Sequence, residues 1–281
     1  GNLLVTPPNP DYYGPAHREE ILILDDILMD EQGALPWGAS SPTHALMGRF
    51  GNVMMVNGDT DHRLSVKQGE VVRFYLTNVA NSRTFNVTFG EARVKLIASD
   101  VGRFEREDWV GSVVIAPAER YVVDVRFEEP GNTVIANTIQ AINHFRGEFY
   151  PRVDTLSIVT VSDEPANPEI SNSFGTLRAY DEVAAELEPY RPHLNREPDY
   201  KLEATLRVQD LPLPIVLSLE ADTLFFPPME WNDAMPVMNW LSTGDQVTWI
   251  LKDQETGAEN GDIDWNFQVG DLVKIRVFNS P

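Results

Sequence analysis

The 281-residue sequence contains no cysteine. A chain without cysteine has no disulfide bonds, thiol nucleophiles, cysteine-ligated zinc, iron–sulfur clusters or copper–thiolate bonds. The sequence also lacks any run approaching the roughly 18 uncharged apolar residues that a membrane-spanning helix requires. We therefore expect no membrane partner, and the residues themselves leave the cellular compartment open.

Basic residues are few compared with acidic ones. The sequence has 22 Lys and Arg against 43 Asp and Glu, which gives a formal net charge of −21. Such a surface repels a phosphate backbone, so we expect no nucleic-acid partner. Apolar residues make up 42% of the chain and aromatic residues 10%, which is typical of a globular protein with a packed core.

Two segments that lie 201 residues apart share one pattern. In each, a glycine is followed by an alternating apolar strand that ends at an asparagine nine residues later, from Gly69 to Asn78 and from Gly270 to Asn279. The corresponding pairs between these ends are Val72 and Val273, Arg73 and Lys274, Phe74 and Ile275, and Leu76 and Val277. The shared turn and alternation predict a duplicated β domain, whose closing strand after Gly270 we expect to be half-buried.

Short alternating runs separated by Gly, Pro and Asn turns predict the fold class. The runs are residues 20–24, 52–56, 85–89, 94–98, 113–115, 121–127, 156–161, 201–208 and 247–251. This spacing indicates an all-β sandwich or barrel. One stretch differs, because the acidic residues 181–188 within a proline-rich region predict a short helix in a linker.

We expect the following domain organisation. Residues 1–15 are the remnant of a linker from a preceding domain, residues 16–163 a complete domain, residues 164–200 a linker, and residues 201–281 the first half of a second domain. A half-domain leaves sheet edges unpaired and apolar faces uncovered. We therefore predict self-association into a dimer or higher oligomer through the exposed edge.

Five segments together resemble the multicopper oxidases, which are laccase-like enzymes built from three cupredoxin domains. They are residues 51–58, 96–102, 115–124, 230–236 and 262–271. The first three are similar to the second domain of that family, and the last two to the opening strands of its third domain. The resemblance implies a cupredoxin-like Greek-key β-sandwich, then a linker and a partial second cupredoxin-like sandwich. It also implies a central fragment of a copper protein from the periplasm or the extracellular space, with the flanking cupredoxin domains as its partners.

The family holds its copper in histidine-rich motifs of the first and third domains, and the resemblance places this chain between those motifs. The residues agree with that placement. A blue-copper centre needs two imidazoles and a thiolate, and a trinuclear copper cluster uses His-x-His pairs. The five histidines are at least 18 residues apart in sequence, at His17, His44, His62, His144 and His193. We therefore expect no metal ligand, no bound cofactor and no oxidase activity, and we interpret the chain as a scaffold between domains with no assigned catalytic residue.

An alternative function is a zinc-dependent hydrolase acting on activated esters or phosphotriesters, because zinc accepts His and carboxylate ligands without cysteine. Its ligands would come from separate loops or across a dimer interface. The segment Asp59-Thr60-Asp61-His62 is the most suggestive one, although carboxylates are ordinary residues in such a turn. The segment His17-Arg18-Glu19-Glu20 is interpreted as a solvated strand start.

The remaining polar and sulfur-bearing clusters are interpreted as structural. Residues 40–44, from Ser40 to His44, bring hydroxyls near an imidazole but lack a nucleophile-elbow pattern. His144 is expected to pack among its apolar neighbours. Met229, Met235 and Met238 surround Glu230 and Asp233, where thioethers can hold Cu(I), but we favour packing at an inter-domain surface.

Overall fold

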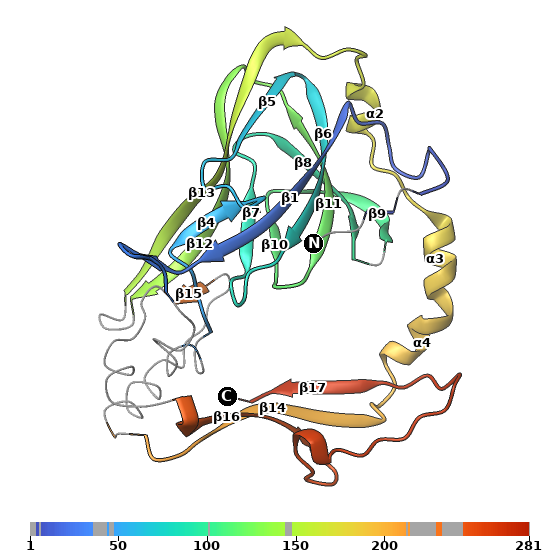
Figure 1. Ribbon diagram of the computed structural model, residues 1–281. Helices are drawn as coiled ribbons and strands as arrows, with labels where there is room; N and C mark the ends of the chain where they lie inside the picture. Colours follow the sequence, from blue (N-terminus) through green and yellow to red (C-terminus); the bar gives the residue numbers. More distant parts are fainter. Residues whose placement is uncertain are drawn as a thin grey trace. The chain divides into compact units, whose positions relative to one another are not determined.

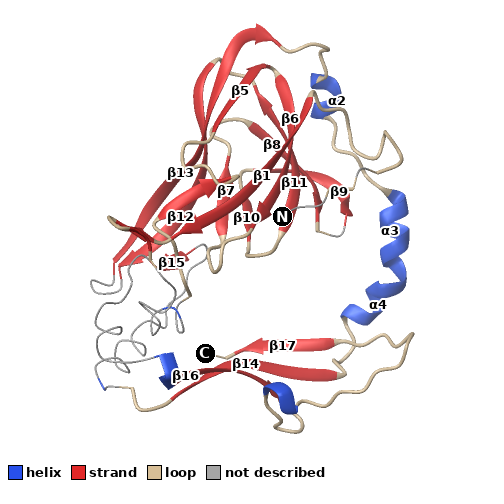
Figure 2. Cartoon of the chain, in the orientation of Figure 1, coloured by secondary structure: helices blue, strands red, loops and turns tan. Residues whose placement is uncertain are grey.

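The computed structural model describes residues 4–5, 7–35, 44, 48–100, 102–143, 148–211, 213, 229–231 and 244–280. The chain divides into two compact units between Val183 and Ala184, and strand β15 (Met229–Trp231) belongs to the first. Strands dominate both units (Figures 1 and 2). No helix among the described residues is both long and apolar enough to span a membrane.

The first unit contains two large sheets. One has the order β4-β1-β6-β11-β8-β9, with β4 Val53–Val56, β1 Arg18–Ile27, β6 Glu70–Asn78, β11 Arg120–Phe127, β8 Arg93–Ser99 and β9 Gly102–Val110. The other has the order β10-β7-β12-β13-β5, with β10 Val113–Ile115, β7 Phe85–Thr88, β12 Gly131–Asn143, β13 Glu148–Pro165 and β5 Arg63–Gln68, and β15 pairs with β12. A small hairpin joins β2 (Met29–Asp30) to β3 (Gly33–Ala34).

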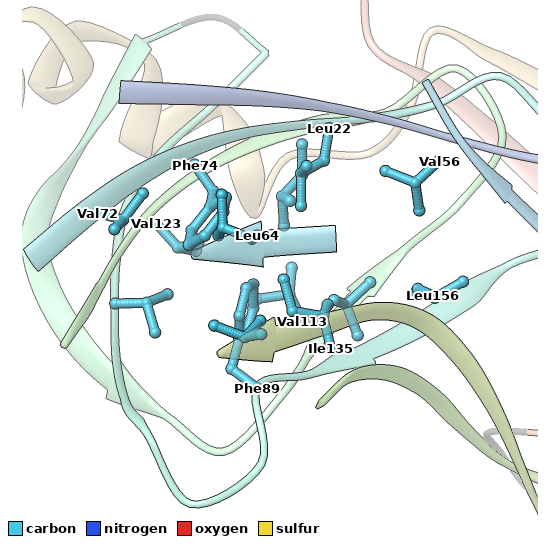
Figure 3. Close-up of a cluster of buried hydrophobic side chains, with 14 of the residues drawn as sticks. Leu22, Val56, Leu64, Val72, Phe74, Phe89, Val113, Val123, Ile135 and Leu156 are labelled. Atoms are coloured by element: carbon cyan, nitrogen blue, oxygen red, sulfur yellow. The ribbon is translucent and has the colours of Figure 1, made fainter. Parts of the chain in front are cut away.

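Alternating side chains of the two sheets form one core. Leu22 and Leu24 on β1 and Phe74 and Leu76 on β6 are at most 1% exposed. They face apolar residues of the other sheet, as Figure 3 shows for residues such as Ile135. Each such side chain contributes roughly 1.5–3 kcal/mol on burial. The expected β-sandwich is therefore the architecture of this unit.

A buried ion pair closes one end of the core. The Arg83 guanidinium donates to Asp26 Oδ2 at 2.8 Å and to the Gly51 carbonyl at 2.6 Å, and Asp26 Oδ2 also accepts from the Gly51 N–H at 2.6 Å. Both charged side chains are 1% exposed. A Cβ atom on Gly51 would lie 2.5 Å from the backbone nitrogen of Ile27, so this approach requires glycine.

The second unit contains a three-stranded sheet of order β16-β14-β17, with β16 Val247–Asp253, β14 Tyr200–Val208 and β17 Ile275–Asn279. Its strand directions repeat those of β4-β1-β6. The central strand pairs parallel with the strand that carries the repeated pattern, as in β1 with β6 and β14 with β17. It pairs antiparallel with the other neighbour, as in β1 with β4 and β14 with β16. The duplication visible in the sequence is therefore also a duplication of topology.

Short helices lie on either side of the boundary between the two units along the chain. They are α2 Ser171–Gly175, α3 Asp181–Leu187, η1 Glu188–Tyr190 and α4 Arg191–Leu194, and two further turns are η2 Gly244–Gln246 and η3 Asn260–Asp262. Helix α3 confirms the predicted acidic helix. Strand β17 differs from expectation, because it begins only at Ile275 and all five of its residues are exposed. The predicted domain boundaries stay a prediction.

Candidate functional site

The outward face of the first sheet holds two connecting segments. We call residues 7–17, which precede β1, the leading segment, and residues 166–183, which follow β13, the trailing segment. Figure 1 shows α2 of the trailing segment beside the chain that precedes β1. Arg73 of β6 contacts the leading segment, Lys95 of β8 contacts the trailing segment, and Arg103 of β9 contacts both. Because strand side chains alternate, these charges point away from the core that their neighbours form.

Arg73 on β6 and Asp124 on β11 form the centre of this face. They are cross-strand partners, and the guanidinium donates to both carboxylate oxygens, at 2.9 and 2.8 Å. Arg73 also donates to the Gly14 carbonyl at 2.7 Å and lies over the Tyr13 ring. Burial raises the pKa of Asp124, and the attraction of Arg73 opposes that rise. The pair therefore ties the leading segment to the sheet.

His17 connects the leading segment to the trailing one. Its Nδ1 accepts a hydrogen bond from the Val71 N–H at 2.9 Å, so Nε2 carries the proton that is donated to the Pro168 carbonyl at 2.8 Å. The imidazole is half-buried. The sequence-based interpretation of His17 as part of a solvated strand start is incomplete, because both ring nitrogens also have protein partners.

Lys95 on β8 and Glu107 on β9 hold the trailing segment. Lys95 Nζ lies 3.4 Å from Glu107 Oε2 and donates to the Thr176 carbonyl at 2.9 Å. Glu107 accepts from the Tyr180 hydroxyl at 2.6 Å and from the Arg178 N–H at 3.0 Å. Burial, followed by this hydrogen bond to Glu107, raises the pKa of Tyr180 far above its ordinary value. Lys95 and Glu107 thus pair with each other and also bind the trailing segment.

The trailing segment also pairs with β9 through its backbone. The Tyr180 N–H donates to the Glu105 carbonyl at 2.8 Å, and the Glu107 N–H donates to the Arg178 carbonyl at 2.9 Å. Phe174 and Tyr180 are buried, at 2% and 3% exposure. The Phe174 ring packs edge-on against Trp109, with centroids 5.2 Å apart. A proline-rich segment that the sequence predicts as a linker is thus packed as part of the first unit.

Arg103 on β9 links the two segments directly. Its guanidinium stacks between the rings of Tyr12 and Tyr180, with its carbon 3.9 and 4.1 Å from the two ring centroids. It donates to the Tyr12 carbonyl at 2.8 Å and to Glu182 at 2.6 Å. Such cation–π contacts contribute about 0.5–2 kcal/mol each. We call the set of Arg73, His17, Lys95, Glu107 and Arg103 contacts the clamp.

An open groove of about 610 Å3 lies between the two segments. Tyr13 and Gly14 line it from the leading segment, and Thr176 and Arg178 from the trailing segment. Arg178 is already engaged, since it donates to the Asp11 carbonyl at 3.0 Å. The cationic side chains of this face therefore bind chain segments, because they contact backbone carbonyl oxygens and aromatic rings.

The residues proposed for zinc are dispersed into separate contacts. Asp61 pairs with Arg63 at 2.9 Å, Asp59 accepts from the Asp61 N–H, and His62 Nδ1 lies 2.9 Å from Ser157 Oγ. In the part of the chain that the structure describes, no group of three or more His, Asp or Glu side chains is arranged to hold a metal ion.

Several candidates lie outside the described residues. These are Ser40, Ser41, Thr43, His144, Asp233, Met235 and Met238. Met229 and Glu230 are described only through the backbone of β15, which pairs with β12 at Gln140 and Ala141. His44 is half-buried, and His193 lies in α4.

Comparison with known proteins assigns the first unit. Residues 21–150 match the family described as "Cu-oxidase: Multicopper oxidase". Over this range the chain is similar to the multicopper oxidases. This confirms the family resemblance of the three motifs within this range, which are residues 51–58, 96–102 and 115–124.

Curated relatives carry two different names. A "Cell division protein FtsP" from Histophilus somni is 33% identical over 41% of this chain and 23% of its own length. A "Laccase" from Bacillus subtilis is 29% identical over 42% of this chain and 25% of its own length. The chain spans between 23% and 33% of the length of the curated relatives it matches.

A solved structure supports the fold. The multicopper oxidase from Campylobacter jejuni, described as a metallo-oxidase, is 17% identical and has a TM-score of 0.50, covering 71% of this chain and 38% of that one. The likeness confirms the all-β, cupredoxin-like fold.

The family implies copper, but the described residues of the first unit do not fit it. The chain has no thiolate to offer. Both nitrogens of His17 are already hydrogen-bonded, and Nδ1 of His62 contacts Ser157. We therefore derive no copper chemistry from these side chains.

Proposed function

We propose that this chain is a structural spacer of a multicopper oxidase-like protein, which holds connecting segments in place and carries no oxidase chemistry in its own residues. The clamp is the observation that supports this proposal. Arg103 contacts both the leading and the trailing segment. His17 of the leading segment contacts β6 and the trailing segment, so the two segments are held relative to each other as well as to the sheet.

The energetics of the clamp suit positioning better than stability. Lys95 and Glu107 are 4% and 1% exposed, and Arg73 and Asp124 are 6% and 4% exposed. A buried ion pair is often no more stable than an apolar pair of the same size, whereas loss of one member costs about 3–5 kcal/mol. Displacing a segment removes hydrogen-bond partners from these buried charges, which raises the free energy of the displaced arrangement.

The names of the relatives are consistent with a spacer. Proteins called a cell division protein and a laccase both resemble this chain. A region that supplies architecture rather than reactive groups can be shared by proteins with different activities.

Limited digestion with chymotrypsin tests the clamp. Phe174 is buried in the docked trailing segment, so cleavage after it requires the segment to leave the sheet. Lys95→Met removes the bond to the Thr176 carbonyl, and we expect cleavage after Phe174 to accelerate about tenfold or more, as about 1.4 kcal/mol implies. The matched control is Arg191→Ala, which removes an exposed pair with Glu188 outside the clamp.

The position of the cuts separates local release from general unfolding. If the clamp positions the segment, the additional cuts are confined to Phe174 and Tyr180, and core sites such as Phe127 remain protected. Cleavage after Phe174 at the same rate in wild type, Lys95→Met and the control would contradict the proposal.

Metal titration tests the second half of the proposal. We expect no intense blue absorption when copper is added to the purified chain, because the chain has no thiolate. The same sample separates the spacer from the zinc hydrolase alternative. Stoichiometric zinc together with chelator-sensitive ester hydrolysis would favour the alternative.

A further inference from the structure

One face of the sheet in the second unit is apolar and exposed. Register places Trp249 of β16 opposite Leu206 of β14, and Leu251 opposite Ala204. It places Val277 of β17 opposite Leu202 on the same face. We call this surface the open face, and its residues are Leu202, Ala204, Leu206, Trp249, Leu251, Ile275 and Val277.

The exposure of these side chains is large for a sheet face. Trp249 is 57% exposed, Leu251 47%, Ile275 44% and Val277 60%. Contiguous apolar surface of this kind marks an interaction site in soluble proteins.

The first unit shows what the open face is suited to contact. Ile275 and Val277 correspond to Phe74 and Leu76 in the repeat, and the parallel pairing makes Leu202 correspond to Leu22. Those three residues of the first unit are at most 1% exposed and pack against a second sheet. The open face therefore has the pattern of an inner sandwich layer.

Part of the face is already organised by aromatic residues. Tyr200, Trp265 and Phe267 form a ring cluster with centroids 4.4–6.3 Å apart. Trp265 Nε1 donates to Asp253 Oδ2 at 2.8 Å. This cluster forms one border of the open face.

Charge distribution favours contact between two copies. Two copies of this acidic chain repel each other in general. The register places only one charged residue, Asp253, on the apolar side of the sheet. That carboxylate accepts a hydrogen bond from Trp265. Lys201, Glu203 and Arg276 occupy the reverse side of the sheet. Two open faces can therefore meet without bringing unpaired charges together.

We propose that the open face binds the open face of a second copy, so that the two sheets form the layers of one sandwich. Two sheets pack about 10 Å apart through interdigitated apolar side chains. Half-exposed side chains of this size each offer on the order of 100 Å2, so Trp249, Leu251, Ile275, Val277 and Phe267 bury about 500 Å2 per copy. The resulting total of about 1,000 Å2 lies at the lower limit for a specific interface, so the dimer is concentration-dependent.

Sedimentation velocity and light scattering on the full chain test the dimer between about 1 and 100 µM. We expect the mass to rise towards twice 31.6 kDa with concentration. Val277→Glu and Trp249→Glu should each keep the chain monomeric at the highest concentration. The matched controls are Phe278→Glu and Thr248→Glu, which change the neighbouring residues on the reverse side and should leave the dimer intact.

Each outcome decides the proposal. A dimer that both open-face variants lose and both controls retain, with unchanged circular dichroism, supports it. A chain that stays monomeric at every concentration overturns it. A dimer that survives Val277→Glu and Trp249→Glu, or that Phe278→Glu abolishes equally, also overturns it and indicates pairing through the edge of β17 or another surface.

Discussion

Arg73 and Lys274, which occupy the same position in the two copies of the repeat, make the same contact. Arg73 donates to the carbonyl oxygen of Gly14 at 2.7 Å, and Lys274 donates to the carbonyl oxygen of Leu194 at 2.5 Å. Strand register makes these two acceptors equivalent. Phe74, which follows Arg73, pairs with Glu20, and Ile275, which follows Lys274, pairs with Tyr200. Gly14 lies six residues before Glu20, and Leu194 lies six residues before Tyr200. A basic residue on the outward side of the sheet thus holds the chain that enters each unit.

We predict that Lys274→Gln loosens the chain that leads into β14. Lys274 Nζ also donates to the Arg196 carbonyl at 2.6 Å, so its loss leaves two carbonyls without their partner. Amide hydrogen exchange of residues 194–200 should accelerate about fivefold to tenfold, as about 1–1.5 kcal/mol for these bonds implies. Arg276→Gln, two residues further along and on the same side of the sheet, is the control, and equal acceleration in both variants would contradict the prediction.

Substitutions of His17 should separate its two hydrogen bonds. Asn at this position can accept from the Val71 N–H as Nδ1 does, and Gln can reach the Pro168 carbonyl as Nε2 does. We expect His17→Ala to lower the free energy of unfolding by about 1–2 kcal/mol and each amide variant by about half as much. Denaturant titration measures this order. An alanine variant as stable as wild type would show that neither bond matters.

Arg83→Met should be among the most destabilising single changes in the chain. The substitution leaves Asp26 charged, buried and without its cation, which costs about 3–5 kcal/mol. The double variant Arg83→Met with Asp26→Leu should recover much of that loss, because it removes the second charge as well. Thermal unfolding measures both changes, and a double variant less stable than Arg83→Met would contradict this explanation.

Alkaline stability should depend on Tyr180. Its pKa is raised in the folded chain by burial and by the bond to Glu107, so above about pH 10 the unfolded chain loses this proton while the folded chain keeps it. Ionisation therefore favours unfolding, and stability falls as pH rises past that point. Tyr180→Phe should lower stability at pH 7 by about 1 kcal/mol but flatten the loss between about pH 9.5 and 11. An unchanged slope would contradict the prediction.

The alternation of apolar and polar residues was sufficient to predict most strands of the sandwich from sequence. Strand β10 begins and ends where the apolar run at residues 113–115 does, and β11 differs by one residue. Strand β12 was not predicted, because its register shifts between Ile135 and Ala136 and its buried Asn137 breaks the apolar period. Strand β9 was missed because five of its nine residues are charged. Its buried residue, Glu107, has its partners in β8 and the trailing segment.

The clamp could not be predicted from local patterns. Arg73, Lys95 and Asp124 alternate with apolar residues, a pattern that ordinarily indicates a solvated sheet face. Their partners lie far away in sequence, as the 151 residues between His17 and Pro168 illustrate. One local signal was available, since aromatic residues cluster at Tyr12 and Tyr13 in the leading segment, where a solvated linker would not need them.

Because the leading and trailing segments are fastened to one sheet, tension applied between them would not pass through the apolar core. The load would fall first on the stacked Arg103 side chain and the imidazole bridge of His17. Those contacts would peel apart one after another at low force, while the sandwich behind them stayed folded. Under load, the two segments would therefore detach from the sheet before the sandwich unfolds.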